Sequence, residues 1–579
     1  RTNLYIALAV VICIAVVFTA LDFLRQAKLK VLRQAARAAA ESYNNQGRDY
    51  RKLGLIEEAL LSYDKAIRLD PGFAMAFNNI GIIYAGLNNY QEASYWFKQA
   101  ARISPRDRAG ILARKNLKRL IELDSGGNIF LAENHSLAYI FWKKIGFKNK
   151  ILVHIDGHMD LARIDKFSLG KILTADTQGL LNLSWRPVEM GKAGKVLGIE
   201  NWIYPAIKSG MIKEFWWVVP DEYLDKASLL KYRDYLKNTL RAPVPIEFKD
   251  GVLSASVYGI PIFICSLENL PVFKEKVLLD IDIDYFTTDK GHNHRVIFLP
   301  RIWPQELFSA LKHKNINPEA LTIAYSVEGG YTPLEYRYLG DLLLDSFLGL
   351  PIDKDLLKYR ILARKYYLRK NYKNAVKFYE KAKQLNPEDP SIDYALSLSF
   401  AGLGLIEKAA SYYKKAIDAD PVYQGAFLFQ AGTYLVNDPY GEGLRLFKEY
   451  ADSPEPAPYL AYANLQLGLL YEGMDKIEEA VEYYQKARNI DPGLRAVYNN
   501  LGNCYAKMGR LDEAVAEYLK AKEIDPGMAI IYFNLGRVYL KKGLYDLAIE
   551  AYQSLLEIDP EFPGAKNNLA YAQKLKEGK

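Results

Sequence analysis

The chain has 579 residues, of which 50% are hydrophobic and 25% are charged. It is too long for a single hydrophobic core and too apolar for a disordered protein. Its formal net charge is +8, and the basic residues are spread among acidic ones and not gathered in one stripe. Because nucleic-acid binding usually needs a concentrated basic face, we expect no nucleic-acid partner. The three cysteines are too few and too scattered for a disulfide framework.

The N-terminal segment carries no charged residue from Leu4 to Leu21. As a helix this run would be about 27 Å long, close to the thickness of the bilayer hydrocarbon. A signal peptide is the alternative, but its apolar region is usually shorter and ends at small residues, which is not the pattern here. Because basic residues follow the run, we predict a single-pass membrane anchor over 1–24, an amphipathic helical linker over 25–40, and a cytoplasmic position for the rest of the chain.

A period of 34 residues follows the linker. Small residues and a proline recur with this spacing: Gly47, Ala59, Ala66 and Pro71 return as Gly81, Ala93, Ala100 and Pro105, and Gly468, Ala480, Ala487 and Pro492 return as Gly502, Ala514, Ala521 and Pro526. The pattern resembles the tetratricopeptide repeat (TPR), a pair of helices that ends at a proline. We expect TPR solenoids over 41–124 and 351–579, the second with a C-terminal capping helix. The resemblance implies protein or peptide partners.

The period is absent from 125 to 350, where short β-branched and aromatic runs alternate with helical stretches. Strands are predicted at 150–154, 214–219, 261–265, 277–284 and 321–326, and helices at 137–145 and 304–312. Such alternation is typical of an α/β sheet with helices on its faces, where chemistry gathers at the carboxyl ends of strands. The expected fold class is therefore α plus α/β, with TPR solenoids flanking an α/β domain.

Two of these strand ends are rich in acidic residues and histidine. The two sets are His154, Asp156, His158 and Asp160 in the first, and Asp280, Asp282 and Asp284 in the second. Alternate residues of an extended strand share a face, so each set is predicted to converge. Neighbouring carboxylates repel unless a cation neutralises them, and this mixture of carboxylate and imidazole suits Mn²⁺ or a similar divalent ion. A solvated acidic turn is the alternative for either motif alone.

The same motifs resemble the arginase and agmatinase (ureohydrolase) superfamily. Asp156-Gly-His158-Met-Asp160 is similar to its Asp-Ala-His-x-Asp signature, Asp282-Ile-Asp284 to its second acidic strand end, and the loop around His135 to its His loop. The chain is most similar to an uncharacterised family related to that superfamily. The resemblance implies an arginase-like three-layer α/β domain over 125–350. It also implies two divalent ions, manganese with zinc or iron as alternatives, that lower the pKa of a shared water. The implied ligands are His135, Asp156, His158, Asp160, Asp282 and Asp284.

Other residues are candidates for further roles in such a site. His154 is a candidate proton relay or partner of a ligand, with a buried, hydrogen-bonded imidazole as the alternative. Glu328 is a candidate for substrate contact or acid–base work. Ala162 stands where arginases have an asparagine, so the resemblance favours another amide or guanidino substrate over arginine. His292 and His294 lie in a polar loop that either borders the pocket or is solvated.

Two functions follow from these patterns. The first is a membrane-anchored TPR scaffold that binds protein partners and carries a dinuclear-metal hydrolase acting on C–N bonds. The second is a non-catalytic TPR scaffold whose middle domain is a degenerate or binding-only module. The feature that favours the enzyme is the nearly complete set of ligands at the two strand ends.

Overall fold

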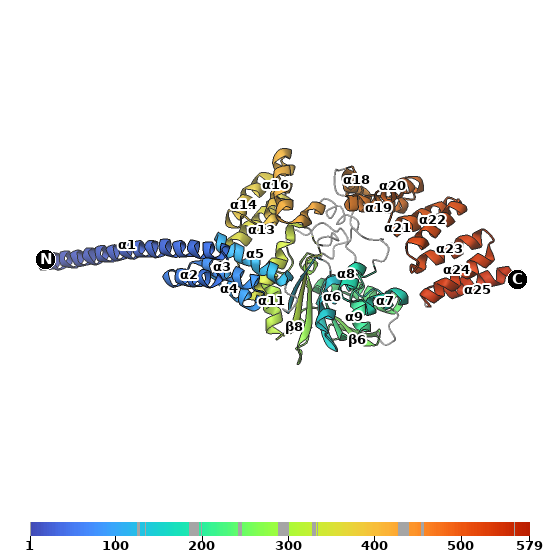
Figure 1. The fold of residues 1–579 in the computed structure, drawn as a ribbon, viewed down its shortest axis with the longest axis horizontal. Coiled ribbons are helices and arrows are strands. Elements are labelled where there is room, and N and C mark those ends of the chain that lie inside the picture. The colour runs from blue at the N-terminus through green and yellow to red at the C-terminus, as the bar shows by residue number, and fades with distance from the viewer. Residues whose placement is uncertain are drawn as a thin grey trace. The chain divides into compact units, whose positions relative to one another are not determined.

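The computed structural model of the chain is drawn in Figure 1. It describes residues 2–123, 128–133, 135–184, 196–198, 200–240, 246–287, 300–326, 332, 334–426, 439–452, 457–560 and 562–578, with side-chain detail from Phe23 onward. The contacts between residues divide the chain into two compact units. The first comprises residues 1–124 with 345–357 and 384–388, and the second comprises the remainder.

The first unit is helical and has the predicted repeat pattern. Its helices are α1 (Thr2–Lys52), α2 (Ile56–Leu69), α3 (Ala74–Gly86), α4 (Tyr90–Ile103) and α5 (Arg108–Leu123). A Cβ atom on Gly47 would lie 2.7 Å from Tyr63 Cε1, and one on Gly81 would lie 2.6 Å from Phe97 Cδ1. The recurring glycines therefore let the two helices of each pair approach until an aromatic ring fills the space between them.

The membrane prediction concerns the first helix. Within the part of the chain whose side chains are described, no helix combines the length and the apolar character needed to traverse a bilayer. The uncharged run Leu4–Leu21 of the anchor predicted over 1–24 lies outside that part.

A mixed sheet occupies the middle of the second unit. Its strands are β1 (Ile129–Ala132), β2 (Lys150–Ile155), β3 (Ile212–Val218), β4 (Glu247–Lys249), β5 (Val252–Val257), β6 (Ile260–Cys265), β7 (Val277–Asp282) and β8 (Pro318–Ala324). Among the described residues the order is β1-β8-β7-β2-β3-β6-β5-β4, and neighbours pair in parallel from β1 to β6. β4, β5 and β6 pair antiparallel. The predicted strands all form, whereas β1, β4 and β5 were not predicted.

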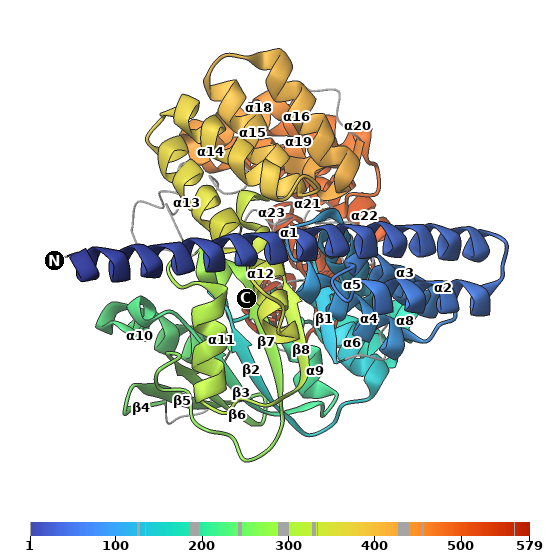
Figure 2. The ribbon, with the colours of Figure 1, turned by 90° about the vertical axis from the view of Figure 1, so that its left-hand side faces the viewer.

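Helices cover both faces of this sheet (Figures 1 and 2). The helices of the domain are α6 (Ser136–Ile145), α7 (Lys166–Thr174), α8 (Thr177–Leu183), α9 (Ile203–Lys208), α10 (Lys226–Asp234), α11 (Pro304–His313) and α12 (Tyr338–Leu348). One face carries α6, α8 and α9, and the other carries α11. The core against α6 and α9 contains Trp142, Trp202, Phe215 and Trp217, all buried. Trp217 of β3 therefore belongs to the sheet core.

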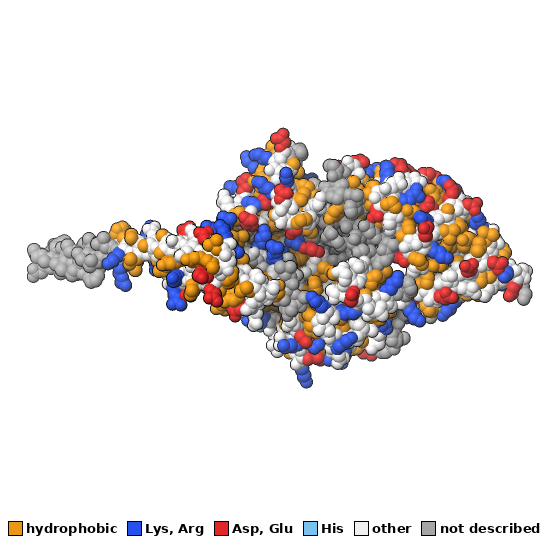
Figure 3. Space-filling view, viewed as in Figure 1, with side chains coloured by type: hydrophobic (Ala, Val, Ile, Leu, Met, Phe, Trp, Pro, Cys, Tyr) orange, Lys and Arg blue, Asp and Glu red, His pale blue; other side chains and the backbone are white. Residues whose placement is uncertain are grey.

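Helix pairs resume after the sheet domain. They are α13 (Lys354–Leu368), α14 (Tyr372–Leu385), α15 (Pro390–Gly402), α16 (Ile406–Ala419), α18 (Leu444–Ala451), α19 (Ala457–Gly473), α20 (Ile477–Ile490), α21 (Arg495–Lys507), α22 (Leu511–Ile524), α23 (Ala529–Lys541), α24 (Tyr545–Ile558) and α25 (Ala565–Lys576). The same contact recurs: a Cβ on Gly502 would lie 2.5 Å from Tyr518 Cε1, and one on Gly536 would lie 2.6 Å from Tyr552 Cε1. On the face drawn in Figure 3, basic and acidic side chains of these helices are interspersed.

Candidate metal centre

The predicted ligands lie at one edge of the sheet. β2 and β7 are parallel neighbours, and their register places His154 opposite Asp280. Asp156 follows β2 directly, and Asp280 and Asp282 lie at the end of β7 itself, so both motifs lie at the same carboxyl edge of the sheet. His135 follows β1, which runs parallel to these strands with β8 between it and β7. The order of the strands therefore brings together three segments that are far apart in the sequence.

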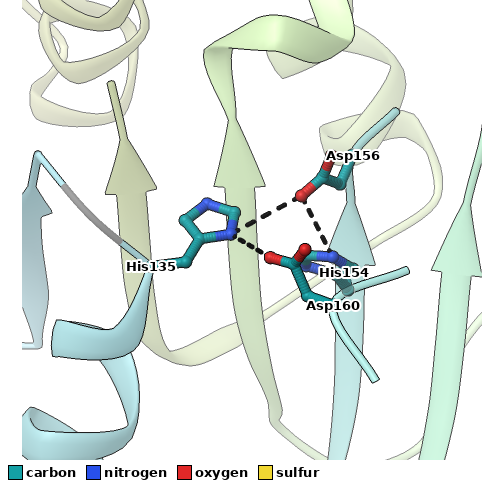
Figure 4. Close-up of side chains that lie close together, drawn as sticks. All are labelled: His135, His154, Asp156 and Asp160. Atoms are coloured by element: carbon teal, nitrogen blue, oxygen red, sulfur yellow. Dashed lines mark hydrogen bonds and ion pairs between the residues drawn. The ribbon is translucent and has the colours of Figure 1, made fainter. Parts of the chain in front are cut away.

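One group of side chains consists of His135, His154, Asp156 and Asp160 (Figure 4). Each offers a ligand atom within 4.8 Å of the others. His135 Nδ1 lies 2.8 Å from Asp160 Oδ2 and 3.5 Å from Asp156 Oδ2. His154 Nε2 lies 3.1 Å from Asp156 Oδ2. All four side chains converge on one small volume, which is the size of a single cation site.

A second group consists of Asp156, His158 and Asp284, again with ligand atoms within 4.8 Å of one another. His158 Nδ1 lies 2.8 Å from Asp284 Oδ2 and 3.6 Å from Asp156 Oδ1. Asp156 belongs to both groups, one oxygen facing each. Asp282 Oδ2 lies 3.4 Å from His135 Nε2, while Asp282 Oδ1 accepts a hydrogen bond from the Asp284 amide at 2.9 Å. The arrangement offers two adjacent cation positions that share a carboxylate.

The route by which these side chains converge differs from the predicted one. β2 ends at Ile155, so Asp156, His158 and Asp160 lie in a turn, and Asp160 has a φ of 52° in the left-handed region. The turn is held by its own side chain, because Asp156 Oδ1 accepts a hydrogen bond from the His158 amide at 2.6 Å. The predicted shared strand face for these three residues is therefore wrong, although the residues do meet.

The second motif departs from the prediction in the same way. β7 ends at Asp282, and residues 283–286 form the short 3₁₀ helix η4 (Ile283–Phe286). Asp280 does not join the other two carboxylates. It lies deeper along the strand, where its Oδ2 is 2.7 Å from His154 Nδ1. The three carboxylates that were predicted to converge thus each lie beside a different imidazole. Asp280 faces His154, Asp282 faces His135 and Asp284 faces His158.

The charges of the cluster hold protons on its imidazoles. Burial lowers the pKa of His154, but Asp156 and Asp280 outweigh it and raise the pKa to about 10. Burial of His135 is likewise outweighed by Asp280 and Asp282, so its pKa lies well above the ordinary value. In the metal-free chain, protonated imidazoles therefore neutralise the buried carboxylates.

The pKa values of the carboxylates shift in two opposite directions. Burial raises the pKa of Asp156, but His154 and His158 outweigh it and hold that pKa well below the ordinary value. Burial and the charge of Asp284 raise the pKa of Asp282 well above its usual range. Burial and Asp156 raise the pKa of Asp284 to about 6. The metal-free cluster is therefore short of positive charge beside Asp282 and Asp284.

The donor set fits a divalent cation. Among the described side chains, His135 Nε2 and Asp280 Oδ1 are buried without a hydrogen-bond partner. The excess of carboxylates over imidazoles near Asp282 and Asp284 is a second unmet demand for positive charge. Carboxylate oxygens with imidazole nitrogens suit Mn²⁺ and neighbouring first-row ions, and no thiolate is present in either group.

Several residues that support this cluster were not predicted. Ser326, two residues after the end of β8, donates a hydrogen bond from Oγ to Asp282 Oδ2 at 2.5 Å. Trp202 donates from Nε1 to Asp160 Oδ2 at 3.0 Å. Trp217 donates from Nε1 to the Asp156 carbonyl at 3.0 Å. Ser326 could have been found from the sequence, because it is a polar residue at the end of a predicted strand. No sequence pattern indicates the two indole contacts.

Three residues named from the sequence lie outside the described part of the chain. These are Glu328, His292 and His294. His313, the remaining histidine of the domain, is exposed at the end of α11, where its Nδ1 lies 2.7 Å from the Ser309 carbonyl oxygen. It stands apart from both groups of candidate ligands.

Comparisons with known proteins identify the repeats. Family models of the tetratricopeptide repeat match residues 44–108, 362–389, 394–423, 461–493 and 493–561. These matches confirm the TPR prediction on both sides of the sheet domain, and they make the chain a protein-interaction scaffold. No curated protein matches the chain.

Several solved structures are similar to parts of the chain. YrrB, described as a TPR protein with an unusual peptide-binding site, is 24% identical; the match covers 34% of this chain and 100% of YrrB, with a TM-score of 0.25. PilF of Pseudomonas aeruginosa is 19% identical over 39% of this chain and 99% of PilF, with a TM-score of 0.25. The TPR domain of P58(IPK) is 11% identical over 93% and 98%, with a TM-score of 0.22. Because these scores are low, the repeat assignment rests on the family models.

Proposed function

Since the chain carries tetratricopeptide repeats, we propose that it is a scaffold whose sheet domain is a dinuclear-metal hydrolase of C–N bonds in amide or guanidino-like substrates. The observation that carries the proposal is the sharing of Asp156 between two adjacent clusters of imidazole and carboxylate ligands. The residues fall into the order expected from the ureohydrolase resemblance: a His loop, the mixed motif and the acidic strand end. A degenerate or binding-only domain remains the alternative function.

The ligands would divide between two ions. His135, Asp156 and Asp160 would hold the first ion, and Asp156, His158 and Asp284 the second. Asp282 lies beside both His135 and the Asp284 amide, which places it between the two positions. Two such ions, manganese with zinc or iron as alternatives, would supply a water of lowered pKa and polarise the scissile bond.

The chain's own side chains have separable parts in this scheme. His154 is fully buried and faces Asp280 on one side and Asp156 on the other, so it orients the shared carboxylate and does not touch substrate. His158 is 47% exposed, whereas His135 and His154 are buried. Substrate therefore approaches on the side of His158 and Asp284. Glu328 remains a candidate for substrate contact.

Metal analysis of the purified full-length chain tests the proposal. We expect about two equivalents of a divalent metal per chain after dialysis. His158→Ala and Asp282→Ala should each lower the amount of bound metal, because each removes a proposed ligand from the pair of linked ion positions. His313→Ala is the matched control, since it removes an exposed imidazole of the same domain that belongs to neither group.

Activity separates the enzyme from the binding module. The metal-loaded chain is incubated with a panel of amides and guanidines, and release of amine, ammonia or urea is measured. Turnover that Asp282→Ala abolishes supports the hydrolase. Metal without turnover on the panel favours the binding-only domain, and a chain without metal rules out the dinuclear centre.

We also propose that the uncharged run Leu4–Leu21 anchors the chain in a membrane with the bulk on the cytoplasmic side. Its support is the length of the run and the basic residues that follow it. Fractionation of cells that express the full chain provides the test. Release of the protein from membranes by alkaline carbonate would contradict an integral anchor.

A further inference from the structure

Three arginines are buried where the segment after β8 meets the repeat helices of the second unit. Arg337 is 8% exposed, Arg360 is 6% exposed and Arg364 is 5% exposed. A buried guanidinium is costly unless carboxylates and hydrogen-bond acceptors satisfy it. The partners of each arginine therefore show which segments of the chain are joined at this junction.

Two of these arginines tie the segment to the repeats. Arg364, on α13, lies 2.9 Å from Glu335 through Nη1 and donates from Nε to Tyr336 Oη at 3.1 Å. Arg360, also on α13, lies with its guanidinium carbon 4.3 Å from the centre of the Tyr338 ring and pairs with Asp389. The segment is thus fixed on α13 by charge and by aromatic contact.

Arg337 is different because its two carboxylate partners belong to different parts of this unit. Nη1 lies 3.1 Å from Asp420 Oδ2, and Asp420 caps the short helix η6 (Pro421–Gly425) after α16. Nη2 pairs with Glu133, which stands two residues before His135. Burial lowers the pKa of Arg337, but the charges of Glu133 and Asp420 outweigh it and hold that pKa well above the ordinary value. One guanidinium therefore bridges a repeat and the loop that carries a candidate metal ligand.

A second set of contacts, through the ring of Tyr325, connects Arg337 to the candidate metal centre. The Arg337 guanidinium carbon lies 4.5 Å from the centre of the Tyr325 ring. The Tyr325 amide donates to the Ala132 carbonyl at 2.8 Å, joining the ends of β8 and β1. The next residue, Ser326, donates to Asp282. Arg337 thus packs on the side chain of Tyr325, whose backbone amide joins β8 to β1 and whose chain neighbour Ser326 donates to Asp282.

We propose that Arg337 is a positioning residue through which the repeat closed by Asp420 controls the geometry of the metal centre. Asp420 fixes the guanidinium, the guanidinium fixes Glu133, and Glu133 sets the loop from which His135 reaches the cluster. The proposal rests on the proposed metal centre. It gives the repeat that ends at Asp420 a role beyond docking partners, because any partner that displaces Asp420 would change the affinity of the site for metal.

The test compares two variants of the full-length chain. Asp420→Asn removes the charge that holds Arg337, while its amide still caps η6. Asp389→Asn is the matched control, because Asp389 also pairs with a buried arginine of this junction and also caps a helix, α15. We expect Asp420→Asn to weaken Mn²⁺ binding about tenfold, as is typical when a residue that supports metal ligands is removed. Asp389→Asn should bind Mn²⁺ like the unaltered chain.

Hydrogen exchange of the 129–140 segment gives a readout that needs no metal. Asp420→Asn should speed amide exchange there, and Glu133→Gln should reproduce both effects from the other side of Arg337. Equal effects of Asp389→Asn on metal affinity and on exchange would overturn the proposal, because the junction would then be merely structural. If the unaltered chain binds no metal, the metal centre fails and exchange alone decides: a change specific to Asp420→Asn and Glu133→Gln upholds the positioning role, and its absence overturns it.

Discussion

At the scale of single residues, two imidazoles of the candidate site each lie between two carboxylates. His154 lies between Asp280 and Asp156, and His158 lies between Asp156 and Asp284. In the metal-free chain, protons on the imidazoles supply the positive charge that the carboxylates need. A metal ion that binds here must displace some of those protons.

This competition predicts that metal affinity depends on pH. The pKa values of His135 and His158 lie above the ordinary value in the folded chain, so both imidazoles are protonated at neutral pH and must lose their protons to bind metal. Affinity for Mn²⁺ should therefore rise with pH, by about tenfold per pH unit for each proton displaced. Isothermal titration calorimetry at several pH values, in buffers of different ionisation enthalpy, measures both the affinity and the protons released.

The same titration distinguishes this site from a surface carboxylate cluster. A cluster of exposed carboxylates is already ionised at neutral pH, so its affinity for metal would be constant between about pH 6 and 8. A flat profile without proton release would contradict the assignment of His135 and His158 as ligands. His313→Ala should leave the profile unchanged, because that imidazole is exposed and belongs to neither group.

The residue types of the site were predictable from the sequence, but their contacts were not. Acidic residues and histidines directly after hydrophobic strands indicated which side chains meet. Sequence spacing could not show that β2 ends before Asp156, because a turn stabilised by the Asp156 side chain replaces the extended strand there. Nor could it show that Trp202 donates to Asp160, since this contact depends on how α9 packs against the sheet.

At the scale of helices and strands, local patterns were the most informative. A glycine on one helix and an aromatic residue on the next, repeated every 34 residues, fix both the pairing and the spacing of the repeat helices. The strands β1 and β4 escaped prediction because they have only 4 and 3 residues. Runs this short carry too few side chains for an alternation to be recognised.

Two glycines of α3 test the packing of the repeats. A Cβ on Gly81 would lie 2.6 Å from the Phe97 ring, whereas one on Gly86 would meet nothing within 4 Å. Alanine favours the helix by up to about 1 kcal/mol at either position. At Gly81 the clash should outweigh this gain and destabilise the pair α3–α4 by about 1–3 kcal/mol.

Hydrogen exchange in α3 and α4 measures this difference without requiring the whole chain to unfold. Gly81→Ala should increase exchange in both helices, and Gly86→Ala should leave it unchanged or reduce it. Equal protection in the two variants would show that the Phe97 ring moves aside at little cost, and that the glycine is not what sets the separation of the helices.

At the scale of the whole molecule, the sheet domain and the repeats differ in their tryptophan content. Trp142, Trp185, Trp202, Trp216, Trp217 and Trp303 lie in the sheet domain, Trp96 lies in the first repeats, and the repeats after residue 351 have none. Tryptophan fluorescence therefore reports mainly on the sheet domain. Far-UV circular dichroism reports mainly on helices, most of which belong to the repeats.

This separation predicts how metal stabilises the chain. An ion at about 100 times its dissociation constant adds about 2.7 kcal/mol to the stability of the part that binds it. For a domain of this size, the fluorescence transition should rise by about 5–10 °C with Mn²⁺ and return with a chelator. The transition seen by circular dichroism should rise less, because most repeat helices hold no ligand. Equal shifts in both signals would instead mean that the sheet domain and the repeats unfold together. In that case Asp420→Asn should separate the two transitions, because it weakens the contact through Arg337.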